Sequence, residues 1–411
     1  MKTIVTTILS AFVLLLASSC KKNQDNIVQP ASSDSFNVVV NNGYGSGKYK
    51  VGDTVHIFSV ASGTNQTFGV WSGSDINLLN VSNEWHAWFK MPAKDISFTG
   101  SLQNIQPFTL QYEQIMGKNG LKPVYYYFPA GHKGIVYLLH GTNGSAADLV
   151  AGYEWQQLIK DLANDKFAII VTEAEEATTG VDANGDGKLR WSQLPADTIN
   201  NIEYANIRIL TDTFYNRGYT DPSKLKYSIG MSDGGFFSAG LSYIFNFKSS
   251  VQYCAQGGDN LVQVTTIPTQ FCMAANDDNP SVGAAGNATA LSNFQALTNR
   301  GICSKYFINP RSPIYPERFA RSGTMSTTQS TAAFTELKSK GFIDSKNYFI
   351  GYSDSFTSAY TSNPSGFPVF NGLTTAQKQA VLAEINLSVA DHHMYSDLNR
   401  ATVKFLNTQC L

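Results

Sequence analysis

The sequence has few charged residues and few cysteines. Charged side chains make up 15% of its 411 residues, against about 25% in an average globular protein. Thirty Lys and Arg side chains against 31 Asp and Glu leave a net charge of −1. Nothing in this balance indicates a basic surface, so no nucleic-acid partner is expected. Five cysteines are too few for a scaffold held together mainly by disulfides.

Long apolar runs are also scarce, and the clearest one covers residues 4–17. It is shorter than the roughly 20 residues that span a bilayer, and it follows Lys2 and leads into Ser18, Ser19 and Cys20. Small residues before a cysteine resemble the lipobox of bacterial lipoproteins. The resemblance implies a signal peptide over residues 1–19, lipid attached to Cys20, and an extracytoplasmic protein that contacts the membrane through this lipid, facing the periplasm or the cell surface. A simple secretory signal with an incidental cysteine is the alternative.

Four cysteines would remain besides Cys20, and they allow three pairings in an oxidising compartment. We expect Cys303 to pair with Cys410, which would fix the C-terminus. Cys254 and Cys272 lie in apolar runs, so they are either a second bridge or buried free thiols.

The length suggests two or three domains. After a polar tether over residues 20–35, residues 36–104 contain short alternating apolar runs at 36–40, 54–58 and 96–100, separated by turn residues such as NNGYGSG at 41–47. This pattern predicts a small all-β module.

Several short motifs of this module stand in a fixed order: GYGSG at 43–47, VGDTV at 51–55, WSG at 71–73 and MPAKD at 91–95. Together they resemble the internalin-type B-repeat domain. That resemblance implies a spacer or a binding accessory on a bacterial surface protein. Trp71, Trp85 and Trp88 would then line a carbohydrate-binding face; the alternative is that they fill the small core.

From residue 107 onward, short apolar runs alternate with longer helical segments. The strands are expected at 123–128, 134–139, 167–172, 225–230, 250–255, 269–275 and 303–309, and the helices at 148–163, 202–217, 234–245, 288–298 and 396–406. Such alternation predicts βαβ units and an α/β domain over residues 107–411 with a mostly parallel sheet. Ligands bind beyond the carboxyl ends of such strands.

A nucleophile motif stands at one of these ends. An apolar strand runs into GMSDGG at 230–235, and a helix follows, so Ser232 occupies the tight strand–turn–helix bend of a G-x-S-x-G serine. A second strand ends in LHGTNGS at 139–145, which suits the loop that supplies one oxyanion donor. The backbone N–H groups of Thr142 and Asp233 are therefore the predicted oxyanion hole. His140 precedes the serine in the chain and is expected to support this loop.

The order serine, acid, histidine locates the other two members of a triad. Asp277 and Asp278 follow the strand at 269–275, and we assign the acid to Asp277 with Asp278 as the alternative. His392 and His393 are the only histidines after Ser232, so one of them is the base. Adjacent side chains do not point the same way; we assign His392, with His393 as the alternative.

The segments LHGTNGSAADL at 139–149 and GMSDGG at 230–235 resemble the polyhydroxybutyrate-depolymerase and feruloyl-esterase group of the α/β-hydrolase superfamily. The resemblance implies the α/β-hydrolase fold and a cofactor-free serine carboxylesterase acting on small esters or acylated polysaccharides. Residues 311–390 depart from the pattern and contain helical stretches at 330–340 and 375–384; we interpret them as a cap insertion that shapes the substrate pocket. The alternatives are a polyhydroxyalkanoate depolymerase-like esterase, a serine peptidase of this fold, and a glycan-binding adhesin with an inactive hydrolase domain.

One further motif falls outside this scheme. Residues 182–193, DANGDGKLRWSQ, match several positions of an EF-hand loop, with Asp182, Asn184 and Asp186 as candidate Ca²⁺ ligands. Gln193 stands where the last ligand would be a glutamate. An ordinary Asn/Asp/Gly turn is the alternative.

Overall fold

The structure is a computed structural model that describes residues 34–410. The predicted signal peptide, Cys20 and most of the predicted tether lie outside the described residues. Within residues 34–410, no helix combines the length and the apolar character needed to cross a bilayer.

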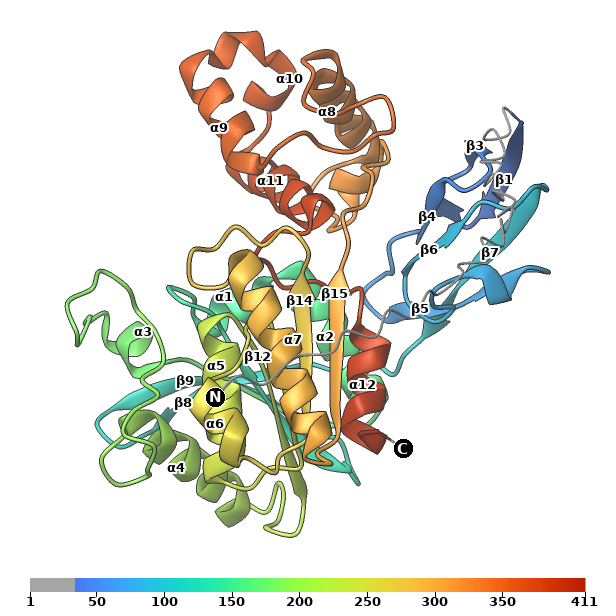
Figure 1. Cartoon of the computed structure of the whole chain (residues 1–411). Coiled ribbons are helices and arrows are strands. Elements are labelled where there is room, and N and C mark those ends of the chain that lie inside the picture. The colour runs from blue at the N-terminus through green and yellow to red at the C-terminus, as the bar shows by residue number, and fades with distance from the viewer. Residues whose placement is uncertain (1–33, 411) are drawn as a thin grey trace, which may run out of the picture.

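An eight-stranded sheet forms the centre of the larger domain (Figure 1). Its order is β15 (Ser304–Asn309), β14 (Thr269–Ala274), β13 (Ser249–Tyr253), β12 (Leu225–Met231), β10 (Gly134–Leu139), β11 (Ala168–Thr172), β9 (Leu121–Tyr127) and β8 (Gln111–Met116). The strands from β15 to β11 are parallel, and β9 and β8 complete the sheet antiparallel to their neighbours. Every residue of β10 and β11 is buried, as expected of parallel strands covered on both faces.

Helices cover both faces of this sheet. Along β10, Val136 and Leu138 pack against α1 (Ala146–Ala151), α2 (Tyr153–Asn164) and α12 (Asn399–Thr408). The alternate residues Ile135 and Tyr137 pack against α4 (Ile202–Asn216) and α5 (Asp233–Ile244). On the same side as α5, α6 (Asp259–Val264) and α7 (Gly283–Asn299) cover β14. Strand order and layers together give an α/β-hydrolase fold, so the predicted fold class is confirmed.

Two local predictions differ from the structure for identifiable reasons. The single helix expected at 148–163 is divided into α1 and α2, because Gly152 adopts an extended conformation between them. The strand β8 was not predicted from the sequence. It is an edge strand whose residues are mostly exposed, so it carries too little apolar alternation to be recognised.

The N-terminal module consists of two small sheets. One has the order β3 (Gly47–Lys50), β1 (Ser35–Asn41), β7 (Ile96–Asn104) and β5 (Gln66–Ser72), and the other has the order β2 (Gly43–Tyr44), β4 (Thr54–Ser59) and β6 (His86–Lys90). Trp71 lies in the core of the module with 1% of its surface exposed, and its Nε1–H donates to the Glu84 carbonyl at 2.9 Å. Trp71 therefore fills the core, as the alternative interpretation expected.

The module packs closely against the larger domain through buried polar contacts. Thr67 donates its hydroxyl to Asp161 of α2 at 2.6 Å, and His86 Nδ1 lies 2.5 Å from the carboxylate of Asp397. The Arg321 guanidinium stacks 3.8 Å from the ring centre of Trp85. These contacts tie the module to the larger domain.

Between β15 and α12, the chain forms a separate group of helices, which Figure 1 shows beyond the end of β15. They are α8 (Thr327–Ser339), α9 (Ser353–Ser362), α10 (Pro368–Asn371) and α11 (Thr375–Val389), with short 3₁₀ turns at Arg318–Ala320 and Pro364–Gly366. These helices bury a core of their own, which includes Phe334, Phe356 and Ile385. We refer to residues 311–390 as the cap. Its last helix leads directly into the histidine pair.

The cysteines divide into one bridge and two thiols. Cys303 and Cys410 form a disulfide with Cα atoms 5.5 Å apart, so the predicted pair is confirmed. It fastens α12 to the start of β15. Cys254 and Cys272 are free and buried, as in the second of the two interpretations.

Candidate active site

Ser232 stands on the sharp bend between β12 and α5. Its backbone has φ 56° and ψ −123°, a conformation that costs a non-glycine residue free energy and is typical of a strained nucleophile turn. Glycines on either side make the bend sterically feasible. A Cβ on Gly230 would collide with the Gly234 backbone, and one on Gly234 would collide with the carbonyls that end β10.

His392 meets the serine from the turn between α11 and α12. Its Nε2 lies 2.8 Å from Ser232 Oγ. His393 is exposed and its Nε2 instead bonds the side-chain amide of Asn386 at 2.7 Å. Of the two candidate bases, the structure therefore brings His392 to the nucleophile.

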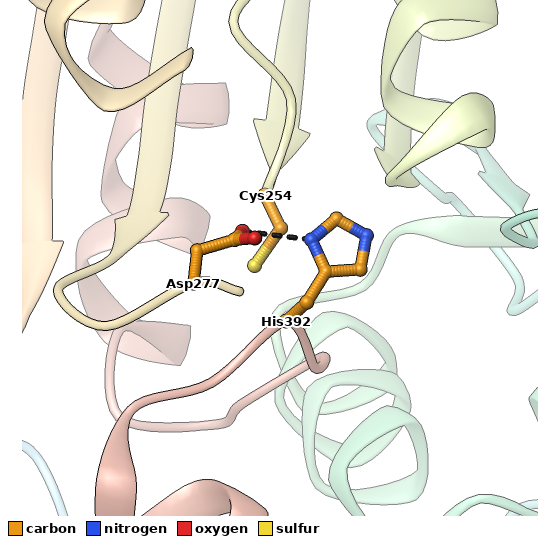
Figure 2. Close-up of side chains that lie close together, drawn as sticks. All are labelled: Cys254, Asp277 and His392. Carbon is orange, nitrogen blue, oxygen red and sulfur yellow. Dashed lines mark hydrogen bonds and ion pairs between the residues drawn. The ribbon is translucent and has the colours of Figure 1, made fainter. Parts of the chain in front are cut away.

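Asp277 lies on the other side of the imidazole. Its Oδ2 is 2.7 Å from His392 Nδ1, the contact that Figure 2 marks with a dashed line. The Asp277 side chain is fully buried. The remaining oxygen accepts backbone N–H bonds from Asn279 at 3.0 Å and Gly283 at 3.3 Å. These bonds fix the carboxylate so that it holds the Nδ1–H tautomer, which leaves Nε2 free to accept a proton.

Asp278, the alternative acid, is exposed and faces Asp391. Desolvation and the hydrogen bond with Asp391 raise the pKa of Asp278 above its ordinary value. Asp391 was not among the predicted site residues, yet its Oδ1 accepts the N–H of His392 at 2.6 Å and that of Asp278 at 3.2 Å. Asp391 therefore connects the loop that carries Asp277 and Asp278 to the turn that carries His392. In the sequence, the only sign of this role is that Asp391 directly precedes the histidine pair.

The predicted oxyanion loop lies against the nucleophile. A Cβ on Gly141 would stand 3.2 Å from Ser232 Cβ, so the glycine allows the chain carrying Thr142 to approach the serine. Asp233 is the first residue of α5, and a helix supplies no acceptor for the N–H groups of its first turn. The chain that carries Thr142 therefore passes close to the serine, and Asp233 follows the serine directly; their role as an oxyanion hole stays a prediction.

His140 supports this loop and does not contact the serine. It is buried, its Nδ1–H donates to the Gly141 carbonyl at 2.6 Å, and its Nε2 accepts the Ala174 N–H at 3.0 Å. Burial lowers the pKa of His140 to about 4, so the ring is neutral at physiological pH. Because both ring nitrogens of His140 form hydrogen bonds with the backbone, its role is structural.

A second loop, residues 181–201, holds the oxyanion loop in place. Asn143 has φ 59° and makes a reciprocal pair of bonds with Leu189: its N–H donates to the Leu189 carbonyl at 2.7 Å, and its Oδ1 accepts the Leu189 N–H at 2.8 Å. Trp191 donates its backbone N–H to Asp233 Oδ2 at 2.8 Å and its indole N–H to the His140 carbonyl at 2.9 Å. Burial raises the pKa of Asp233 to about 6. We call residues 181–201 the clamp loop.

The candidate calcium ligands lie in the same clamp loop, where Asn184 and Asp186 are exposed and Asp182 is half-buried. The two oxygens of Asp182 accept N–H bonds from Gly185 at 2.8 Å and Gly187 at 2.6 Å. Asp186 forms an ion pair with Arg190. The structure thus gathers these residues into one turn whose oxygens already have partners; Ca²⁺ binding stays a prediction.

Comparison with known proteins finds no matching family model and no matching curated protein. Similar solved structures include a ferulic acid esterase (TM-score 0.36, 10% identity, 49% of this chain and 89% of that chain). They also include a dienelactone hydrolase from Anabaena variabilis (TM-score 0.36, 15% identity, 49% and 87%). An α/β serine hydrolase without a lid, from Xanthomonas campestris, has TM-score 0.33 and 11% identity over 51% and 88%. Similarity at this level says nothing of the activity or the substrate of this chain.

Proposed function

We propose that this protein is a serine esterase that hydrolyses carboxylic acyl esters through Ser232, His392 and Asp277. The observation that carries the proposal is the continuous hydrogen-bond chain from Ser232 Oγ to His392 Nε2 at 2.8 Å and from His392 Nδ1 to Asp277 Oδ2 at 2.7 Å. A serine, a base and an orienting acid in this geometry are what acyl transfer requires.

In the acylation step, Ser232 Oγ attacks the ester carbonyl carbon while its proton passes to His392 Nε2. The carbonyl oxygen becomes an oxyanion, and in this proposal the Thr142 and Asp233 N–H groups donate to it. Asp277 stabilises the imidazolium that forms. When the tetrahedral intermediate collapses, the C–O bond to the alcohol breaks, and His392 gives its proton to the leaving oxygen.

Deacylation repeats these steps with water. His392 Nε2 takes a proton from a water molecule, whose oxygen attacks the acyl-enzyme carbonyl. The bond to Ser232 Oγ breaks, the serine recovers the proton from His392, and the carboxylic acid leaves. Each proton therefore returns to its starting atom, and no cofactor takes part in the cycle.

The substrate class we propose is an acyl ester on a carbohydrate, of feruloyl or acetyl type, and it rests on the motif resemblance. Asp278 and Asp391 lie beside the triad, where Asp391 Oδ1 accepts the backbone N–H of His392 at 2.6 Å and that of Asp278 at 3.2 Å. Carboxylates at this point favour an uncharged ester over an anionic one.

Ester hydrolysis is tested with short-chain nitrophenyl esters on wild type and three variants. Ser232→Ala and His392→Ala should lose activity by several orders of magnitude, while His393→Ala, the matched control beside the base, should keep most of it. Equal rates for Ser232→Ala and wild type would refute the proposal. Faster cleavage of peptides than of esters would favour the peptidase alternative.

We further propose that lipid on Cys20 anchors the enzyme outside the cytoplasm. Labelling with a radioactive fatty acid should mark wild type and leave Cys20→Ser unlabelled; label on both would refute the anchor.

For the clamp loop, we propose Ca²⁺ binding at Asp182, Asn184 and Asp186. Added Ca²⁺ should then raise the melting temperature of wild type and leave that of Asp182→Asn unchanged; equal shifts would exclude this site.

A further inference from the structure

A buried thiol lies directly behind the triad. Cys254 follows β13 with φ 46°, has 0% of its surface exposed, and points its Sγ at the His393 carbonyl, 3.4 Å away. Figure 2 shows its side chain beside those of Asp277 and His392. Sγ, a carboxylate oxygen and an imidazole nitrogen of these three residues all lie within 4.8 Å of one another. The proposed catalytic cycle makes no use of this thiol.

The three side chains form the donor set of a zinc-type site. Thiolate, imidazole and carboxylate are the ligands that Zn²⁺ takes, at about 2.0–2.3 Å, while Ca²⁺ and Mg²⁺ require oxygen ligands. Ligands of a tetrahedral zinc ion stand roughly 3.3–3.8 Å apart, within the 4.8 Å that encloses the present atoms. Among residues 34–410, this is the one group of three such side chains close enough to hold an ion.

The three ligands come from different segments that meet at one end of the sheet. Cys254 follows β13, the strand next to β12, Asp277 follows β14, and His392 precedes α12. The His392 side chain is 12% exposed, whereas Asp277 and Cys254 are fully buried, so His392 is the member of the set that solvent contacts. To admit the ion, Nδ1 of His392 and Oδ2 of Asp277 must separate from 2.7 Å by roughly 0.7 Å to reach tetrahedral spacing.

We propose that a zinc-class divalent cation binds Cys254 Sγ, Asp277 and His392 Nδ1 and thereby switches off the enzyme. The inhibitory part of this inference rests on the proposed esterase function. The thiol loses its proton to solvent on binding. The neutral imidazole, coordinated through Nδ1, moves its remaining proton to Nε2. Nε2 then has no lone pair to accept the proton of Ser232, and the nucleophile is no longer activated.

The chain provides a matched control for the thiol. Cys272 is also free and buried, and it lies on the neighbouring strand, where the Gln270 side-chain amide donates to its Sγ at 3.1 Å. It is not part of the three-residue set. If the metal bound any buried thiol, replacing either cysteine would weaken metal binding. At the proposed site, only replacement of Cys254 weakens it.

The experiment titrates the full protein with Cd²⁺ and Zn²⁺ and follows two signals. The first is thiolate-to-cadmium charge-transfer absorption, which reports binding whether or not the protein is an esterase. The second is hydrolysis of a nitrophenyl ester, expressed relative to the uninhibited rate of each variant. The variants are Cys254→Ser, Cys254→Ala and Cys272→Ser, and their folding is compared by circular dichroism melting.

Wild type and Cys272→Ser should both show the absorption band and inhibition that a chelator reverses. In both Cys254 variants the band should disappear and the inhibitory metal concentration should rise by more than about 100-fold, since even partners outside the ligand set contribute 10–100-fold to metal affinity. Mg²⁺ should have no effect. Unchanged inhibition in the Cys254 variants, or inhibition without the band, would overturn the site. A band without any ester hydrolysis would support the metal site and refute the proposed function alone.

Discussion

Replacing Asn143 should slow catalysis although this side chain makes no hydrogen bond to a triad residue. Its Oδ1 accepts the Leu189 N–H at 2.8 Å and so ties the oxyanion loop to the clamp loop. One such hydrogen bond contributes about 0.5–1.5 kcal/mol, which corresponds to an approximately 2–13-fold change in the population of the ordered loop. We therefore expect Asn143→Gly to lower kcat by a factor in this range.

The largest decrease in kcat that this variant can cause is set by the Thr142 N–H, the oxyanion donor that the loop carries. Complete loss of one oxyanion donor lowers kcat by roughly 10²–10³-fold, so a larger effect would mean that the fold itself has changed. KM should change little, because the Thr142 N–H is needed mainly in the transition state. The assay is steady-state hydrolysis of a nitrophenyl ester, with kcat and KM determined separately.

Two further variants separate the effect of the Asn143–Leu189 hydrogen bond from that of the backbone conformation at Asn143. Asn143 has φ 59°, which glycine adopts freely and alanine adopts at a cost of about 1–2 kcal/mol. Asn143→Ala should therefore be slower and less stable than Asn143→Gly. Asn143→Asp keeps an acceptor for the Leu189 N–H and should stay close to wild type. If the Gly variant keeps wild-type kcat, or if the Asp variant is as slow as the Ala variant while folded, the clamp does not position the oxyanion hole.

The remaining predictions concern the acid, the pH dependence of stability and the disulfide. Asp277→Asn should lower kcat by roughly 10⁴-fold, because an amide stabilises the wrong imidazole tautomer; Asp278→Asn should keep most activity in the same assay, and the reverse ranking would exchange their roles. Burial raises the pKa of Asp233 from 3.8 to about 6, so its contribution favours folding at low pH and is lost as the pH rises through about 6. Urea unfolding should therefore show that Asp233→Asn gains up to about 3 kcal/mol at pH 8 and nothing at pH 4; an equal gain at both would refute this origin. Replacing Cys303 and Cys410 together with serine should lower the free energy of unfolding by about 2–4 kcal/mol in non-reducing urea melts, and an unchanged melt would argue against the bridge.

The joint between cap, module and catalytic domain could not be predicted from local sequence. Arg321 of the cap pairs with Glu154 of α2 at 2.8 Å and with Glu384 of α11 at 2.9 Å, and it stacks on Trp85. These residues stand far apart in the chain, and each alone reads as an ordinary surface charge or aromatic. Their burial is a property of the packed domains, since buried charges persist only where partners surround them.

The sequence by itself determined the features that depend on residues close together in the chain. Buried parallel strands such as β10 read as continuous apolar runs, and the bend at Ser232 requires glycines at fixed spacing. Both are local properties, so the hydrolase fold and the nucleophile were predictable. The pairing of Cys303 with Cys410 could be preferred among the three options because Cys254 and Cys272 lie in apolar runs.

Tertiary structure alone decided which of two neighbours carries each role. His392 and His393 are identical in kind and adjacent, and only the direction in which the turn after α11 enters the site places His392 against Ser232. Similarly, the sequence identifies Cys254 only as one more residue of a buried apolar run. The tertiary structure shows that it lies beside Asp277, where β13 and β14 end. Side-chain direction depends on the path of the whole chain, and contacts between residues more than a hundred positions apart leave no local pattern to read.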